Sequence, residues 1–437
     1  MNILVAAYKF GTEQEIGEHL GTYHYFIEKM RRVVKSGHEV HVVCPWLTFM
    51  RKGSVKFDGI TIHRYWPPLF NVAWAWPLNR FVRWWYMVRT RKKTLQVLNA
   101  FKCEVVYVWQ ARETGYALSQ IKGKLGVPLI FRQITAWRWH FERTIADIFA
   151  SRRWYRIAQR LKLQRVTDPI LHHLLDLGIH VHYARTIYRC TDKVVLLSNA
   201  AVEEAVTLGL PRSKAETIGV AIEDNVFKPL LTGKKILREQ LGIKGEKVIC
   251  FIGRLNFAEK GIGWLLSAMP AILHAVPEST LVMVGGGVEI ERVKRICHAL
   301  SIEPSVQLAG KKSLLELVKF INASDVFVLP SLWMEAFGQV TIEAMSCGVP
   351  VVTSDAGASP EINLHGETGY VVHVHDTKAL ADAIIALLNN ETLRQRFGRA
   401  ARERVMEKYT YDVMTNKFID IISSSINSNI KTQNSKP

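Results

Sequence analysis

The sequence has no unbroken apolar run of about 18 residues, the length that a helix needs to cross a bilayer. Its longest tryptophan-rich stretch, Trp66 to Leu78, is interrupted by Pro67, Pro68 and Pro77. We therefore predict no membrane-spanning segment, so any association with a membrane would be peripheral.

Cysteine is sparse and follows no pattern. The six cysteines form no C-x-x-C pair, and no secretory signal follows Met1. Scattered cysteines of this kind are typical of free thiols in a reducing compartment. The sequence thus predicts a cytoplasmic protein without disulfides, with thiols at Cys44, Cys103, Cys190, Cys250, Cys297 and Cys347.

Motifs for metal and dinucleotide binding are also missing. The glycines after the first apolar run are not spaced as G-x-G-x-x-G, which argues against a dinucleotide fingerprint. Three histidine pairs have no carboxylate or cysteine at ligand spacing, so we expect no metal site. These pairs are His172 with His173, His180 with His182, and His373 with His375.

What is present is an alternation of short apolar runs and helical patterns over 437 residues, 48% of them hydrophobic. The run Asn2 to Tyr8, a helix over about 23–35 and the run Glu39 to Cys44 make a βαβ opening. Strands continue at 60–64, 105–109, 128–133, 193–197 and 217–222, and again at 248–253, 281–284, 306–309, 326–329 and 349–353. The length and the alternation predict two doubly wound α/β domains.

The positive charge is concentrated. Residues 51–165 contain 23 Lys or Arg against 5 Asp or Glu, which accounts for the whole net charge of +18, and ten of the twelve tryptophans precede residue 165. Arg and Trp together suit an anionic bilayer surface. The alternative is a core filled with tryptophan beneath a solvated basic face. Nucleic acid would also be attracted, but no nucleic-acid-binding signature accompanies the charge, so we do not expect it as a partner.

Residues 331–361 combine a loop, a helical pattern over 339–347 and a strand, directly after the strand 326–329. Ligands of such units bind at the carboxyl ends of the strands, beside helix N-termini. Glu335 precedes this helix and Glu343 lies four residues after Gln339 within it, so Glu343 could accept both hydroxyls of a ribose. The alternative is that Glu335 caps the helix and Glu343 is a solvated helix residue.

Basic residues and glycines follow three other strands. Arg254 ends one strand, and Lys260 stands six residues later at the start of a helix; such a pair can hold a diphosphate. Gly286 lies in a run of three glycines after 281–284, where backbone can approach a ligand closely. Lys311 follows the strand 306–309.

The pattern E-x-F-G-x-x-x-x-E-A-M-x-x-G-x-P-V-V from Glu335, followed by Gly357, Pro360, Glu361 and Gly366, closely resembles the donor-site signature of the retaining nucleotide-sugar glycosyltransferases of the GT-B type, family four. The resemblance implies two Rossmann-like domains facing each other across a cleft, with a C-terminal helix crossing back to the first domain.

The resemblance also implies roles for individual residues. Arg254, Lys260 and Glu335 would be catalytic, and the donor, a UDP- or GDP-sugar, would be bound by Gly21, Gly286, Lys311, Phe337, Gly338, Gln339 and Glu343. The chain contains no D-x-D, the metal-binding motif of the other major glycosyltransferase fold, so the expected mechanism is independent of metal.

The first domain departs from the family pattern. Leu20 replaces one glycine of the pair that precedes the first helix, Ile218 replaces an asparagine, and Ile134-Thr135 stand where the family has a histidine that contacts the sugar. His140 is not expected to take that role. A basic, aromatic insertion, predicted helical, runs from Trp137 to Arg189.

The predicted domains are an acceptor-binding domain over 1–228, a nucleotide-sugar domain over 229–408, a crossover helix over 409–425 and a disordered tail over 426–437. The predicted acceptor is a glycan or lipid-linked glycan of cell-surface polysaccharide, lipopolysaccharide or glycolipid synthesis. Residues 51–165 would dock on the inner face of the plasma membrane. The alternatives are an epimerase or phosphorylase on the same scaffold, and a non-enzymatic membrane- or nucleic-acid-binding protein.

Overall fold

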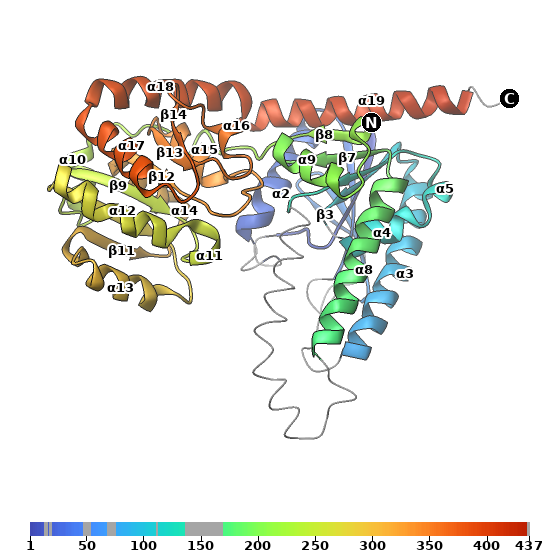
Figure 1. Cartoon of the computed structure of the whole chain (residues 1–437). Helices are drawn as coiled ribbons and strands as arrows, with labels where there is room; N and C mark the ends of the chain where they lie inside the picture. Colours follow the sequence, from blue (N-terminus) through green and yellow to red (C-terminus); the bar gives the residue numbers. More distant parts are fainter. Residues whose placement is uncertain are drawn as a thin grey trace, which may run out of the picture. The chain divides into compact units, whose positions relative to one another are not determined.

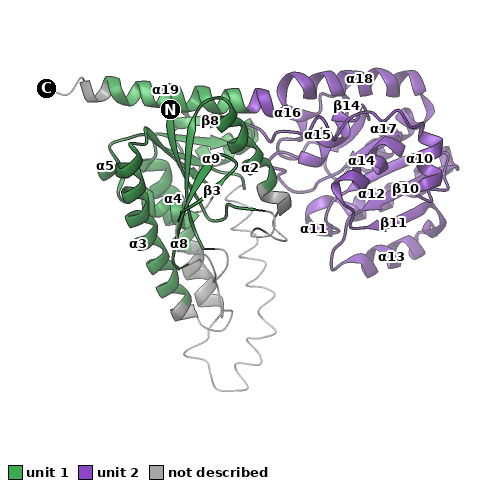
Figure 2. Ribbon diagram, turned by 180° about the vertical axis from the view of Figure 1, so that it is seen from behind, with its two compact units in different colours: residues 1–218, 415–437 green, residues 219–414 purple. Residues whose placement is uncertain are grey.

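The computed structural model describes residues 1–12, 16, 20–46, 54–67, 76–110, 112–135 and 169–434. The chain forms two compact units (Figures 1 and 2): unit 1 contains residues 1–218 and 415–437, and unit 2 contains residues 219–414. Among the described residues, no helix is both long enough and apolar enough to span a membrane.

Unit 1 is built on an eight-stranded sheet in the order β3-β4-β2-β1-β5-β6-β7-β8. Only the pairing of β3 with β4 is antiparallel among the described strand pairs. The strands are β1 (Asn2–Ala7), β2 (Glu39–Pro45), β3 (Ser54–Phe57), β4 (Ile60–Tyr65), β5 (Val105–Trp109), β6 (Leu129–Arg132), β7 (Lys193–Leu196) and β8 (Ala215–Thr217).

Helices cover both faces of this sheet. The helices are α2 (Leu20–Lys35), α3 (Trp76–Phe101), α4 (Arg112–Ser119), α5 (Lys122–Leu125), α8 (Pro169–Cys190), α9 (Asn199–Thr207) and the 3₁₀ turn η2 (Arg212–Lys214). Side chains of α3, α4 and α8 pack on Val106 and Phe131 in one hydrophobic core. On the opposite face, Phe26 of α2 stacks on Trp109 with ring centroids 3.8 Å apart.

Unit 2 is built on a parallel six-stranded sheet in the order β11-β10-β9-β12-β13-β14. The strands are β9 (Lys247–Ile252), β10 (Ser279–Val284), β11 (Val306–Gly310), β12 (Val326–Leu329), β13 (Val351–Ser354) and β14 (Gly369–Val372). The helices are α10 (Lys234–Gln240), α11 (Phe257–Lys260), α12 (Ile262–Ala275), α13 (Ile290–Ala299), α14 (Leu314–Ala323), α15 (Gln339–Ser346), α16 (Ser359–Ile362), α17 (Thr377–Asn389) and α18 (Glu391–Lys408), with the 3₁₀ turn η3 (Glu303–Ser305).

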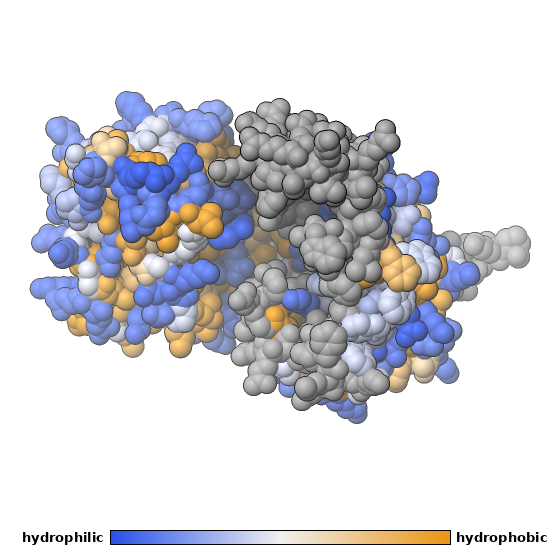
Figure 3. Space-filling view, turned by 90° about the horizontal axis from the view of Figure 1, so that it is seen from below, coloured by the Kyte–Doolittle hydropathy of each residue, from blue (hydrophilic) through white to orange (hydrophobic). Residues whose placement is uncertain are grey.

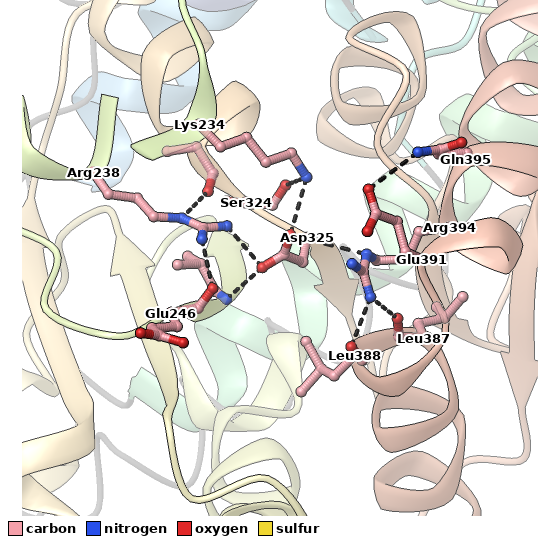
Figure 4. A network of polar contacts seen from close by, with 12 residues as sticks. Lys234, Arg238, Glu246, Ser324, Asp325, Leu387, Leu388, Glu391, Arg394 and Gln395 are labelled. Atoms are coloured by element: carbon pink, nitrogen blue, oxygen red, sulfur yellow. Dashed lines mark hydrogen bonds and ion pairs between the residues drawn. The ribbon is translucent and has the colours of Figure 1, made fainter. Parts of the chain in front are cut away.

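Asp325 ties together the amino ends of β9 and β12 (Figure 4). Its carboxylate accepts hydrogen bonds from Lys234 at 3.1 Å, Arg238 at 2.7 Å and the backbone N–H of Val248 at 2.8 Å, and Arg394 of α18 lies 3.9 Å away. Burial alone would raise the pKa of Asp325, but Lys234 and Arg238 outweigh it and lower that pKa. This network lies at the edge of the sheet opposite to the carboxyl ends of the strands.

Helix α19 (Tyr411–Asn434) carries the chain back to unit 1, as the sequence predicts for a crossover helix. Phe418 packs edge-on against Tyr107, with ring centroids 4.9 Å apart. The predicted disordered tail is wrong for residues 426–434, which continue the helix. The reason is apolar spacing: Phe418, Ile422 and Ile426 recur every fourth residue and are buried.

The boundary between the units also differs from the sequence-based one. Residues 219–228 belong to unit 2 rather than to the first domain, because Ile222 donates its N–H to Tyr409 at 2.9 Å and Ser346 donates to the carbonyl of Phe227 at 2.6 Å. The strand predicted over 217–222 is accordingly wrong beyond Thr217. The apolar residues that suggested it, Ile218, Val220 and Ile222, are buried outside any named strand.

Candidate functional site

The centre of the unit 2 sheet is a topological switch point. β9 pairs with β12, whereas β10 and β11 extend the sheet beyond β9, and β13 and β14 extend it beyond β12. In parallel α/β sheets, ligands bind outside the carboxyl ends of the strands at such a point. The loops over 253–261 and 330–338 leave β9 and β12 here, and they carry Arg254, Lys260 and Glu335.

The loop after β9 is fixed on the end of β12. The Asn256 side chain caps α11 by accepting two backbone N–H groups of its first turn, at 2.9 and 3.3 Å. Gly261 follows with φ +61°, and a Cβ there would lie only 1.8 Å from the carbonyl oxygen of Pro330. Lys260 is therefore the last residue of α11, not the first residue of the next helix as the spacing predicted, and close packing holds its backbone at the switch point.

Lys260 and Glu335 come together from these two loops. The Lys260 ammonium lies 2.6 Å from the Glu335 carboxylate, and both side chains are about four-fifths buried, with exposed fractions of 18% and 19%. Ser331 also donates to Glu335, at 3.2 Å. An ammonium has three donors, so Lys260 can bind an anionic ligand while it keeps the contact with Glu335.

Arg254 follows the end of β9, as the sequence predicts. Its guanidinium pairs with Glu259 at 3.1 Å, and its side chain is 66% exposed. Among the described ion pairs, Arg254 and Lys260 thus each bind a separate carboxylate. Nothing in the sequence pattern distinguishes Glu259, which lies between them, from an ordinary solvated residue of a short helix.

Gly286 and Lys311 meet beside this loop. A Cβ on Gly286 would lie 3.1 Å from the Lys311 side chain, and Gly286 accepts the N–H of Leu255 at 3.0 Å. A Cβ on the neighbouring Gly285 would lie 1.9 Å from the carbonyl oxygen of Gly253. The loops after β9, β10 and β11 are therefore in backbone contact, and Lys311 is exposed among them.

The N-terminus of α15 begins at the same edge of the sheet. Its N-cap residue is Gly338, with φ +85° and no side-chain cap, so the suggested capping role of Glu335 is wrong. The first N–H groups of a helix attract an anion. Gln339 is exposed, whereas the side chain of Phe337 is buried edge-on against Tyr409, with ring centroids 5.4 Å apart. Only the backbone of Phe337 is available to a ligand.

Glu343 is buried inside α15, with 4% of its surface exposed. It is not the solvated helix residue of the alternative interpretation. Gln339 donates to its Oε1 at 2.9 Å. Burial raises the pKa of Glu343 from 4.5 to about 7, and the bond from Gln339 opposes this only in part. In its ionised form, a buried carboxylate needs hydrogen-bond donors, and hydroxyl groups can supply them.

The remaining candidate positions lie in unit 1. Gly21 is in the first turn of α2, and Ile134 and Thr135 follow β6 in half-buried positions. His140 and the first part of the predicted insertion, up to residue 168, lie outside the described residues; its last part is α8.

Within the described part of the chain, no group of three His, Cys, Asp or Glu is arranged to hold a metal ion. His373 of one predicted pair instead bonds Asp355 at 2.6 Å, and His182 of another bonds Tyr116 at 3.2 Å. His172 and His173 are in α8, but their side chains are not among those described.

Residues 233–404 match the family model of the glycosyl transferases group 1. Unit 2 is similar to the group 1 glycosyl transferases over this range, which includes every unit 2 residue of the candidate site. The family resemblance of the sequence pattern is thereby confirmed.

Two curated relatives match part of the chain. N-acetyl-alpha-D-glucosaminyl L-malate synthase of Bacillus anthracis is 31% identical over 255 residues, which are 58% of this chain and 62% of the relative. Phosphatidyl-myo-inositol mannosyltransferase of Mycobacterium leprae is 32% identical over 187 residues, 43% and 49% of the two chains. The matches thus span about half to three-fifths of these relatives.

Similarity to solved structures extends over the whole chain. HepE from Anabaena, solved with UDP-glucose, is 18% identical with a TM-score of 0.67, covering 97% of this chain and 100% of its own. At this identity the likeness concerns the fold. The predicted fold class, two parallel-sheet domains of the GT-B type with a C-terminal helix, is confirmed.

Proposed function

We propose that this protein is a retaining glycosyltransferase that moves one sugar from a nucleoside-diphosphate sugar to a glycan or lipid-linked acceptor. The observation that carries the proposal is the contact of Lys260 with Glu335 at the switch point of a group 1 domain. Two loops that are far apart in the sequence bring a cation, a carboxylate and a helix N-terminus together at the carboxyl ends of β9 and β12.

The chemical demand is stabilisation of the leaving group. The bond between the anomeric carbon and the diphosphate breaks, and its electron pair goes to the diphosphate. The acceptor hydroxyl then forms the new bond on the same face, and its proton passes to the departing diphosphate. Lys260, the N-terminus of α15 and Arg254, once it leaves Glu259, provide positive charge for the departing diphosphate. No carboxylate of this chain is assigned as a covalent nucleophile.

The donor would lie along the carboxyl ends of β9 to β12. In its ionised form, Glu343 would accept the ribose hydroxyls, and Gly286 with Lys311 would lie beside the base and diphosphate. Glu335, Gln339 and the backbone of Phe337 and Gly338 would contact the sugar. UDP-glucose is the ligand in the HepE structure, so UDP-sugars are donors to test beside GDP-sugars.

Features of unit 1 support the proposed acceptor and the proposed site of action. Helix α3 carries six Lys or Arg and no Asp or Glu, and Trp84 and Phe81 on it are 56% and 54% exposed. These features support docking on an anionic membrane, peripherally on its cytoplasmic face. A relative named for a phosphatidyl-myo-inositol substrate supports a lipid-linked acceptor, and hence a role in glycolipid, lipopolysaccharide or surface polysaccharide synthesis.

Incubation with radiolabelled UDP-sugars tests the proposal, with membrane lipid extracts as acceptors and without them. We expect label in an extractable product only when both substrates are present, and an anomeric configuration in that product equal to the donor's by NMR. An isomerised nucleotide sugar without acceptor would indicate an epimerase, and an inverted product would contradict retention.

A further inference from the structure

Helices α3, α4 and α8 enclose a groove of about 730 Å³ on unit 1. Its residues are far in sequence from the loops over 253–261 and 330–338. Its lining from α3 is a single helical stripe of Trp84, Met87 and Arg91, which rises about 10 Å along the helix. The opposite wall is α8, with Ile179 and Tyr183. A volume of this size is in the range of small-molecule and lipid sites.

One end of the groove is apolar and built from rigid rings. Met87 and Tyr183 are each only 7% exposed, and Tyr116 stacks on Tyr183 with centroids 4.0 Å apart. Trp84 is 56% exposed and packs beside Phe81, with ring centroids 5.8 Å apart. Figure 3 views the molecule from the lower ends of α3 and α8 in Figure 1, and it shows hydrophobic residues among hydrophilic ones on the visible surface. The apolar wall therefore continues to exposed aromatic rings.

The other end is polar and carries an uncompensated positive charge. Gln120 donates to the Tyr116 hydroxyl at 2.8 Å, the Tyr116 hydroxyl bonds His182 at 3.2 Å, and Arg91 donates to Gln120. Among the described ion pairs, Arg91 has no carboxylate, and its buried Nε has no hydrogen-bond partner there. A guanidinium at the end of an apolar groove is complementary to a ligand with an anionic head and an apolar chain.

We propose that this groove binds one acyl chain of an anionic phospholipid, with the lipid phosphate on Arg91. The inference rests on the proposed membrane docking of unit 1, and it adds a defined binding site for a single lipid. A basic surface alone holds many lipids loosely, whereas this groove holds one lipid with defined stoichiometry. Trp84 and Phe81 at its mouth would remain at the bilayer interface.

Gly178 offers a way to close the groove without disturbing the fold. It lines the groove, is exposed, and has no atom within 4 Å of where a Cβ would stand. Gly178→Phe would place a ring in the groove. Replacing a helical glycine does not lower intrinsic helix stability, so the variant should fold. Lys92, exposed on the same helix but outside the groove lining, is the matched charge control for Arg91.

The test is calorimetric titration of the full chain with lyso-phosphatidylglycerol below its micelle concentration. We expect saturable binding of one lipid per chain, weakened at least tenfold in Gly178→Phe and Arg91→Gln and unchanged in Lys92→Gln. Lyso-phosphatidylcholine should bind more weakly and respond only to Gly178→Phe. Unsaturable binding, or equal binding by Gly178→Phe, would overturn the proposal.

Two further readouts separate this proposal from the others. Gly178→Phe should still sediment with phosphatidylglycerol vesicles, since the basic surface remains, and should still be stabilised by the nucleotide-sugar donor. If vesicle binding is lost while lyso-lipid binding is unchanged, the groove is not the lipid site. If the wild-type protein binds the lyso-lipid as predicted but no nucleotide sugar, the proposed catalytic function is wrong and the proposed lipid site in the groove is still supported.

Discussion

At the scale of single residues, the proposed catalysis depends most on the ion pair of Lys260 with Glu335. We predict that Lys260→Ala lowers turnover by two to three orders of magnitude, because one preorganised positive group is lost where negative charge develops. Steady-state rates with a UDP-sugar measure this. Lys294→Ala, which removes an exposed lysine paired with Glu291, is the control and should keep full activity.

Circular dichroism decides whether the loss is chemical. The far-UV spectrum and the melting temperature of Lys260→Ala should stay close to wild type, because Ser331 still donates to Glu335. Wild-type rates in both Lys260→Ala and Arg254→Ala would exclude the proposed stabilisation of the leaving group.

The raised pKa of Glu343 should make the stability of the folded protein depend on pH in an unusual way. Its folded pKa of about 7 lies above its ordinary value of 4.5, because burial disfavours the charge. Protonated Glu343 therefore stabilises the folded state fully below pH 4.5, and this stabilisation is lost as the pH rises through 7. The loss in the free energy of unfolding between these two pH values is roughly 3 kcal/mol. We predict that Glu343→Gln lacks this decline.

Urea unfolding at pH 5 and pH 8 measures the effect. The stability difference between Glu343→Gln and wild type should favour the variant more at pH 8 than at pH 5. Identical pH profiles for the two proteins would mean that Glu343 is ionised without cost in the folded state. Other titrating groups are common to both proteins and cancel in the comparison.

The sequence predicted the positions of the candidate site residues relative to the strands better than it predicted their contacts and burial. Glu335, Gly286 and Lys311 follow β12, β10 and β11 as the strand pattern predicted, whereas Lys260 ends α11 and does not open the next helix. The partner of Arg254 and the burial of Glu343 could not be predicted. Both depend on which side chain a loop from another strand covers, and the spacing of residues along one chain does not contain that information.

At the scale of elements, the Asp325 network should hold unit 2 together independently of the site. We predict that Asp325→Asn lowers the free energy of unfolding by about 3–5 kcal/mol, because it leaves the charges of Lys234 and Arg238 without their buried partner. Thermal unfolding of unit 2 measures this loss. Asp382→Asn, which removes an exposed carboxylate paired with Lys378, should unfold like wild type.

Strands were the elements that the sequence predicted most reliably, because buried parallel strands are short apolar runs bounded by glycine or proline. β12, for example, has the predicted bounds of Val326 to Leu329. The errors lie where apolar residues serve another purpose. Residues 219–222 belong to unit 2 instead of extending the first sheet, and Ile422 and Ile426 extend α19 through a polar tail.

At the scale of the whole molecule, the charge distribution predicts salt-dependent membrane binding. We expect binding to phosphatidylglycerol vesicles to fall at least tenfold between roughly 0.1 and 0.5 M salt, because exposed charges are screened. Co-sedimentation measures it. The double variant Lys92→Glu/Lys93→Glu on α3 should weaken binding, whereas Lys294→Glu/Arg295→Glu on α13 should not. Equal effects of the two variants would refute docking through α3.

The central claim is that the carboxyl edge of the unit 2 sheet binds a nucleoside-diphosphate sugar. A thermal-shift panel of UDP, GDP and their sugars tests it most directly, since a bound ligand raises apparent stability by mass action. We predict that at least one nucleotide sugar raises the melting temperature of the wild type, and that Lys260→Ala and Glu343→Gln reduce this shift. If no nucleotide or nucleotide sugar shifts the wild-type protein, the donor site does not exist.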